Sequence, residues 1–215
     1  TRAGPEIGVA STKAYTTQLL ALMLLGIHLG RLRGHLPARK GQALLAKLGR
    51  SSEWIREILK RPSERTLAAG LRKASNVLFI GRHVNGATAL EGALKLKEIS
   101  YVHAEGYLGG ELKHGPLAMV EKGLPVVAVL QDGPLFPKML SHIQQVKARG
   151  GRVIAVASEG VRGVSDEILP IPACDPFVSP LLAIIPLQRF AYEMARSRGR
   201  DIDHPRNLAK SVTVE

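Results

Sequence analysis

The feature that most constrains the fold is an alternation of short apolar runs with helical segments in the second two thirds of the chain. Short runs that are apolar throughout are typical of strands buried on both faces of a sheet. The runs are Val77–Ile80, Pro125–Leu130, Arg152–Ala157 and Glu167–Ile171, with a weaker one at Val102–Tyr107. Helical segments are expected at residues 87–99, 135–149 and 179–198. This order predicts an α/β fold, a three-layer αβα sandwich with a flavodoxin-like parallel sheet.

Residues 6–73 show helical periodicity and no strand-like run. The apolar stripe of the first helix is Leu19, Leu20, Met23, Leu24 and Ile27. The segment Gly34–Pro37 breaks this helix, and a second helix is expected over Gln42–Lys60. Its inward residues are predicted to be Leu44, Leu45, Leu48, Ile55, Ile58 and Leu59. Ser63 is expected to cap a third, short helix that ends at Lys73.

Composition excludes several classes of protein. The net charge of +12 comes from 30 Lys and Arg against 18 Asp and Glu, but aromatic residues make up only 4% and the basic residues are dispersed. We therefore expect solvated helix faces and no nucleic-acid partner. The single cysteine, Cys174, excludes an intrachain disulfide and a Cys-rich zinc site. The longest apolar run, Leu19–Ile27, is too short to span a bilayer and no leader precedes it, which predicts a cytoplasmic protein without membrane contact.

The turns after the predicted strands offer no nucleotide-binding motif. The first turn, Gly81–Gly86, is not a G-x-G-x-x-G fingerprint, and no phosphate-binding P-loop sequence occurs. The later turn Gln131–Pro134 has no hydroxyl side chain and carries the acidic Asp132. The sheet domain alone is therefore predicted to bind a phosphate group weakly, and no cofactor is expected.

Two groups of ionisable residues could carry chemistry. Glu91, Lys95 and Glu98 share one face of a predicted helix, either as an exposed ladder of ion pairs or as a carboxylate placed for proton transfer. His114 lies between glycines in an irregular loop, either as a structural cap or as an acid or base near neutral pH. The histidines show no metal-ligand spacing, so no metal site is expected. On composition alone, residues 199–215 are typical of a frayed terminus.

Four motifs, in order and across essentially the whole chain, resemble one family. They are GPEIGVASTK (4–13), ALKLKEISY (93–101), GELKHGP (110–116) and DHPRNLAKSVTVE (203–215). The family is that of the glutamine–fructose-6-phosphate aminotransferases (isomerizing), also called glucosamine-6-phosphate synthases. The last of these motifs is highly specific.

The resemblance implies an enzyme of hexosamine biosynthesis built from sugar isomerase (SIS) domains. The family converts fructose 6-phosphate and glutamine-derived ammonia into glucosamine 6-phosphate, and its full-length members carry an N-terminal glutaminase domain. This chain is expected to hold the closing helices of a truncated first SIS domain (1–73), a second SIS domain (74–198) and an active-site tail (199–215). The family's hydroxyl-rich phosphate loop belongs to the first SIS domain, upstream of Thr1.

The resemblance also implies roles for individual residues. Lys210 matches the lysine that forms a Schiff base with C2 of the sugar, and Glu98 matches the base that moves a proton between C1 and C2. Lys95 matches a lysine beside that base. These roles fit the chemistry of an amine, a carboxylate and a neighbouring cation.

His114 matches the histidine that opens the sugar ring, which the family offers to the active site of the neighbouring subunit. A homodimer is therefore expected. The backbones of Val9 and Ala209 match positions that line the sugar. Three alternatives stay open: a non-catalytic phosphosugar-binding SIS module, a sugar-phosphate isomerase that uses no ammonia, and a chain inactive without the upstream phosphate loop.

Overall fold

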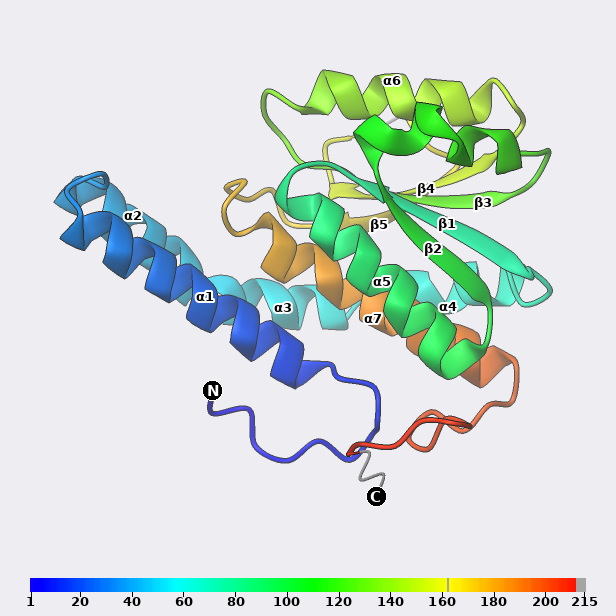
Figure 1. Cartoon of the computed structure of the whole chain (residues 1–215), viewed down its shortest axis with the longest axis horizontal. Coiled ribbons are helices and arrows are strands. Elements are labelled where there is room, and N and C mark those ends of the chain that lie inside the picture. The colour runs from blue at the N-terminus through cyan, green and yellow to red at the C-terminus, as the bar shows by residue number, and fades with distance from the viewer. Residues whose placement is uncertain (162, 212–215) are drawn as a thin grey trace.

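The centre of the molecule is a parallel sheet, seen in a computed structural model that describes residues 1–161 and 163–211 (Figure 1). Within these residues the sheet has five strands in the order β2-β1-β3-β4-β5. The strands are β1 (Asn76–Gly81), β2 (His103–Leu108), β3 (Pro125–Val129), β4 (Arg152–Ser158) and β5 (Glu167–Ile171). All five predicted strands are therefore confirmed, and the order is that of flavodoxin-like folds.

Helices cover both faces of this sheet and make the three predicted layers. Helices α5 (Val84–Ser100) and α7 (Ser179–Ser197) lie on one face, and α6 (Phe136–Lys147) lies on the other (Figure 1). Alternate strand residues point to the two sides: Phe79 joins the cluster that includes α5 and α7, and Leu78 joins the cluster that includes α6. The segments expected at 87–99, 135–149 and 179–198 are thus confirmed as helices.

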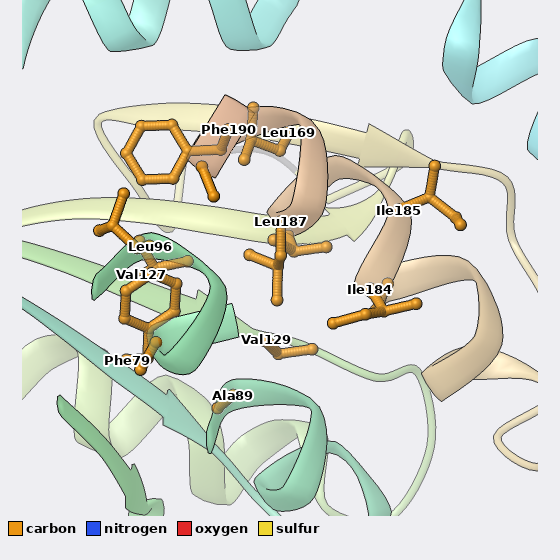
Figure 2. Packing of buried hydrophobic residues seen from close by; sticks show 14 of the residues in the cluster. Phe79, Ala89, Leu96, Val127, Val129, Leu169, Ile184, Ile185, Leu187 and Phe190 are labelled. Carbon is orange, nitrogen blue, oxygen red and sulfur yellow. The ribbon is translucent and has the colours of Figure 1, made fainter. Parts of the chain in front are cut away.

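The larger core lies between the sheet and the pair α5 and α7 (Figure 2). Phe79 and Phe190 are fully buried there, together with Leu96 of α5 and Leu187 of α7. The two helices pack closely because α5 has a glycine at the contact, where a Cβ on Gly92 would lie 2.7 Å from Leu187 Cδ1. This packing fixes the direction of α5, whose last turns carry the candidate site.

The first part of the chain forms four helices among the described residues. They are α1 (Lys13–Leu32), α2 (Ala38–Gly49), α3 (Ser51–Leu59) and α4 (Ser63–Gly70). The prediction of a single helix over Gln42–Lys60 was wrong, because the chain turns at Arg50 and separates α2 from α3. The predicted cap was also wrong: Ser63 is itself the first residue of α4, and its hydroxyl bonds to the Glu64 carboxylate.

The predicted apolar stripes are only partly buried. Met23 and Ile27 of α1 are buried as expected, and so are Leu48 of α2 and Ile58 of α3. Three other leucines expected to point inward are exposed instead: Leu24, Leu45 and Leu59. Helices α1 and α2 form a hairpin that extends away from the sheet (Figure 1). Few other elements pack around α1, so part of its apolar stripe stays exposed.

The tail after α7 folds back along the segment that precedes α1 (Figure 1). The amide of Val9 donates to the carbonyl of Asp203 across a distance of 3.0 Å, which joins the two segments. The tail is therefore docked as far as Lys210, whose amine bonds to Glu6, and the prediction of a frayed terminus was wrong for residues 199–210. The last part of the motif, residues 212–215, lies outside the described residues. In the described part of the chain, each helix is too short or too polar to cross a bilayer.

Candidate active site at the docked tail

The segment before α1 is organised by one carboxylate. Glu6 Oε1 accepts the backbone N–H of Thr12 at 2.9 Å and that of Ala14 at 3.0 Å. These are amides at the beginning of α1 that have no partner within the helix. The side chain of Glu6 is only 7% exposed, so its carboxylate has a defined position, and the tail binds to it.

Lys210 of the tail binds to the Glu6 carboxylate. Its Nζ donates to Glu6 Oε2 at 2.8 Å, to the carbonyl of Gly8 at 3.1 Å and to the carbonyl of Val9 at 3.3 Å. Burial alone raises the pKa of Glu6, but the hydrogen bonds from Lys210, Ala14 and Thr12 outweigh it and lower that pKa to about 2. The structure thus brings two predicted site residues, Lys210 and Val9, into direct contact.

A tyrosine at the end of α5 holds the middle of the tail. Tyr101 has a left-handed backbone (φ 60°) that ends the helix, and its Oη accepts the backbone N–H of Arg206 at 2.8 Å. The guanidinium of Arg206 lies over the Tyr101 ring at 4.3 Å, and that of Arg200 lies at 5.3 Å. Such cation–π contacts add to the hydrogen bond. Tyr101 therefore sets the course of the tail four residues before Lys210.

The charged residues of α5 form a buried group. Lys95 is 3% exposed, and its Nζ lies 2.6 Å from Glu98 Oε2 and 3.5 Å from Glu91 Oε1. Burial raises the pKa of Glu91, and the neighbouring Lys95 opposes that rise. The alternative of an exposed ladder of ion pairs was therefore wrong for these three residues. The ammonium of Lys95 therefore lies between two carboxylates in a largely buried setting.

Glu98 and the tail line the same cleft. This cleft has a volume of about 520 Å³, and Glu98, Tyr101, Arg206 and Leu208 contribute to its wall. A second cavity of about 230 Å³ lies beside Glu6 and includes Gly8, Lys13 and Asp203. Ala209, between Leu208 and Lys210, is exposed. The tail lines the cleft of Glu98 as far as Leu208, whereas Lys210, two residues later, contacts Glu6 and Gly8 at the second cavity.

His114 lies apart from these groups within one chain. It ends the short 3-10 segment Gly109–His114, which follows β2 and packs against α6. Leu112 of this segment belongs to the core on the α6 side of the sheet, whereas Glu98 is on α5 on the other side. The imidazole of His114 is exposed. The structure therefore brings together Lys210 and Val9, and Lys95 and Glu98, but it does not bring His114 to them.

The carboxyl ends of the strands, where open α/β sheets usually bind ligands, are filled with protein side chains. Asn85 donates to Ser179 Oγ at 2.8 Å and to Gln131 Oε1 at 3.2 Å. The cavity beside them, lined in part by Gln131, Ser179 and Cys174, measures about 10 Å³. This volume is at the lower limit for one water molecule. The candidate site is therefore at the opposite end of the sheet, where α5 ends and the tail docks.

Two residues of the site, Glu6 and Tyr101, were not predicted from the sequence. A carboxylate shortly before a helix start is a recognisable signal, because it can satisfy free amides there. Tyr101 carried no comparable signal, since its role depends on a tail that lies about a hundred residues further along the chain. In residues 1–161 and 163–211, no three His, Cys, Asp or Glu side chains group as a metal site.

The parallel sheet, its two helical layers and the charged end of α5 define the class of the protein. The family model of the SIS domain, which describes its sequences, matches residues 70–195, more than half of the chain. The chain therefore belongs to the SIS domain family. Within that family, nearly its whole length is similar to glutamine–fructose-6-phosphate aminotransferases (isomerizing), as the predicted resemblance implied.

Two relatives and one solved structure illustrate this similarity. An enzyme of Thermus thermophilus is 52% identical over 217 residues, and that of Leifsonia xyli is 49% identical over 223 residues. The chain spans 36% of the length of each relative. The solved C-terminal domain of the Francisella tularensis aminotransferase is 40% identical, with a TM-score of 0.91 over 95% of this chain and 58% of that one.

Proposed function

We propose that this chain is the isomerase part of a glucosamine-6-phosphate synthase. It would turn fructose 6-phosphate and glutamine-derived ammonia into glucosamine 6-phosphate. The observation that carries the proposal is the position of Lys210, whose amine is held at the carbonyl of Val9 while the same tail borders the cleft of Glu98. The names of the relatives support this reaction class.

The first step assigned to the site is Schiff-base formation at Lys210. Its neutral amine adds to C2 of the open-chain ketose, and the C=N bond forms as the former carbonyl oxygen leaves as water. The backbone carbonyls of Gly8 and Val9 lie within 3.1 and 3.3 Å of the Lys210 nitrogen, so its location is defined from two sides. The backbone of Ala209, the residue before Lys210, lines the sugar in this proposal.

The second step is proton transfer by Glu98. Its carboxylate takes a proton from C1 of the C2 imine, and the proton on the carboxylate exchanges with water before one is returned to C1 or to C2. Ammonia replaces the Lys210 nitrogen at C2 of the imine before the transfer to C2, which frees the lysine amine, so that the product is the 2-amino aldose. The carboxylate must be ionised to begin. The ammonium of Lys95, 2.6 Å away and 3% exposed, is the neighbouring cation of this step.

The ring-opening step requires a second copy of the chain. The exposed His114 lies on the α6 side of the sheet, away from Lys210 and Glu98, so it is free to enter the site of a neighbour. In a two-fold dimer each subunit then gives one histidine and receives one. We therefore propose a homodimer in which the imidazole opens the hemiketal ring of the sugar bound by the partner.

The proposed domains follow the same assignment. The match over residues 70–195 supports a second SIS domain at 74–198, preceded by helices of a first SIS domain and followed by the active-site tail. The relatives are longer, so the glutaminase domain and the upstream phosphate loop are assigned to the longer protein. A phosphosugar-binding module without catalysis is the competing function, and it has no use for the buried Lys95–Glu98 pair.

Hydrogen exchange at C1 of the sugar tests the proposal. The purified chain is incubated with fructose 6-phosphate in D₂O, and deuterium at C1 is followed by NMR for the wild type, for Glu98→Gln and for the exposed control Glu121→Gln. We expect exchange in the wild type and in the control, and a loss of at least about a hundredfold in Glu98→Gln. Wild-type exchange at the spontaneous rate refutes the catalytic function, and an active Glu98→Gln variant refutes the role of Glu98.

A further inference from the structure

We propose that Glu6 is a positioning residue that holds the amine of Lys210 in place. The inference rests on the proposed function for the chemistry of Lys210, but the contact itself stands on geometry. An ammonium has three N–H donors, and Lys210 has three acceptors within 3.3 Å: Glu6 Oε2, Gly8 O and Val9 O. The arrangement therefore fits the protonated amine, and Glu6 is the one charged group among the three.

The pair is asymmetric, which makes Glu6 the fixed partner. The Glu6 side chain is 7% exposed, whereas that of Lys210 is 47% exposed. One carboxylate oxygen is committed to the amides of Thr12 and Ala14 at the start of α1, and the other faces Lys210. The position of the tail lysine is thereby tied to the beginning of a 20-residue helix.

The ionised state of Glu6 suits it to hold the amine of Lys210 and not to remove a proton from it. The hydrogen bonds that reach it lower its pKa to about 2, so it is a poor acceptor for the proton that Lys210 must lose before it attacks a carbonyl. Two further charged residues line the cavity beside Glu6, namely Lys13 and Asp203. The function of Glu6 is therefore to place the amine beside Val9, and the proton of Lys210 leaves to water or to the incoming sugar.

The contacts allow a selective substitution. In Glu6→Gln the amide oxygen still accepts from Thr12 and Ala14, so the cap of α1 is kept. The amide NH₂ then occupies the place of Oε2 and cannot accept a hydrogen bond from Lys210. Glu121→Gln is the matched control, because it removes the same charge from an exposed glutamate in a different part of the chain.

Competitive labelling measures the effect without any sugar. Each protein is treated with trace acetic anhydride between pH 7 and pH 11, and acetylation of Lys210 is quantified by mass spectrometry relative to the exposed Lys40. We expect Lys210 to react several-fold faster at pH 8 in Glu6→Gln, because no carboxylate then holds its amine, and to be unchanged in the control. Equal labelling of Lys210 in Glu6→Gln and wild type overturns the inference.

A second variant keeps the test valid if Glu6→Gln does not fold. Lys210→Met changes an exposed tail residue, and carboxyl NMR then reports on Glu6 itself. The pKa of Glu6 is expected to rise when the Lys210 hydrogen bond is lost, and an unchanged pKa also overturns the inference. Trapping with fructose 6-phosphate and borohydride separates the two proposals: no adduct on wild-type Lys210 counts against the proposed function, while the labelling result decides the role of Glu6.

Discussion

Replacing Lys95 with methionine tests the buried charges of α5. Methionine keeps most of the apolar stem of lysine and removes only the ammonium. The variant leaves the carboxylates of Glu91 and Glu98 facing each other without a cation, with exposed side-chain fractions of 15% and 21%. Removing one partner of a buried ion pair is strongly destabilising because the remaining charge stays desolvated.

The expected magnitude follows from this partial burial. A fully buried pair costs about 3–5 kcal/mol when one partner is removed, and we take the lower end because water still reaches both carboxylates. A loss of about 3 kcal/mol in the free energy of unfolding lowers the melting temperature of a chain of this size by roughly 6–12 °C. The matched control is Lys97→Met, two positions further on the same helix, where the lysine is exposed. That variant should stay within about 0.5 kcal/mol of the wild type.

The assay is chemical unfolding at several pH values, and the sign of the pH dependence is fixed. Burial already raises the pKa of Glu91 in the folded protein, and loss of Lys95 raises it further. A carboxylate whose pKa is higher in the folded than in the unfolded state gains stability as pH falls. The gap between Lys95→Met and wild type should therefore be largest at pH 7 and narrow toward pH 5. Equal stability of the two lysine variants at pH 7, or a gap that widens with acid, contradicts a stabilising role for the Lys95 charge.

Three further predictions concern the packing of β2, the docking of the tail and the lone thiol. Gly106→Ala should lose about 1–3 kcal/mol in urea unfolding, because its Cβ would lie 2.7 Å from the backbone of α5, while Gly160→Ala, with open space around it, should be neutral. Tyr101→Phe removes the acceptor for the Arg206 amide, worth about 1 kcal/mol, so trypsin should cut after Arg206 about fivefold faster; an unchanged rate contradicts the anchoring role. Burial, with Asp132 and Asp175 nearby, raises the pKa of Cys174 to about 11, so iodoacetamide at pH 8 should alkylate it about a hundredfold more slowly than a free thiol.

The sheet could be predicted well because its signal is local. Each strand is a short apolar run, and β1, β3 and β5 are each followed by a helix, so the existence and the parallel direction of the strands follow from the pattern. The prediction of a single helix over residues 42–60 was wrong because the break at Arg50 has no local signal in the sequence. Residues 42–60 keep a helical spacing of apolar residues throughout, and the turn between α2 and α3 depends on how α3 packs against α7, which no local pattern encodes.

The site was predicted in part, and the limits are physical. The spacing of Glu91, Lys95 and Glu98 predicted their shared face but not their burial, which is produced by tertiary packing around α5. The tail has no periodicity, because its docking uses single contacts such as the Val9–Asp203 hydrogen bond in place of a repeating apolar face. The resemblance to a family predicted the role of Lys210 as a site residue. Its contact with Glu6 follows only from the folded chain.

The assignment of Lys210 as the residue that binds the sugar is best tested by borohydride trapping of the wild-type chain with fructose 6-phosphate, followed by mass spectrometry of the C-terminal peptide. Lys210→Arg is the control, because arginine keeps the positive charge beside Glu6 but forms no Schiff base under these conditions. We expect a reduced hexose-phosphate adduct on Lys210 and its absence in the control. A folded wild-type chain without an adduct, or with equal adducts spread over its exposed lysines, would show that Lys210 does not have this role.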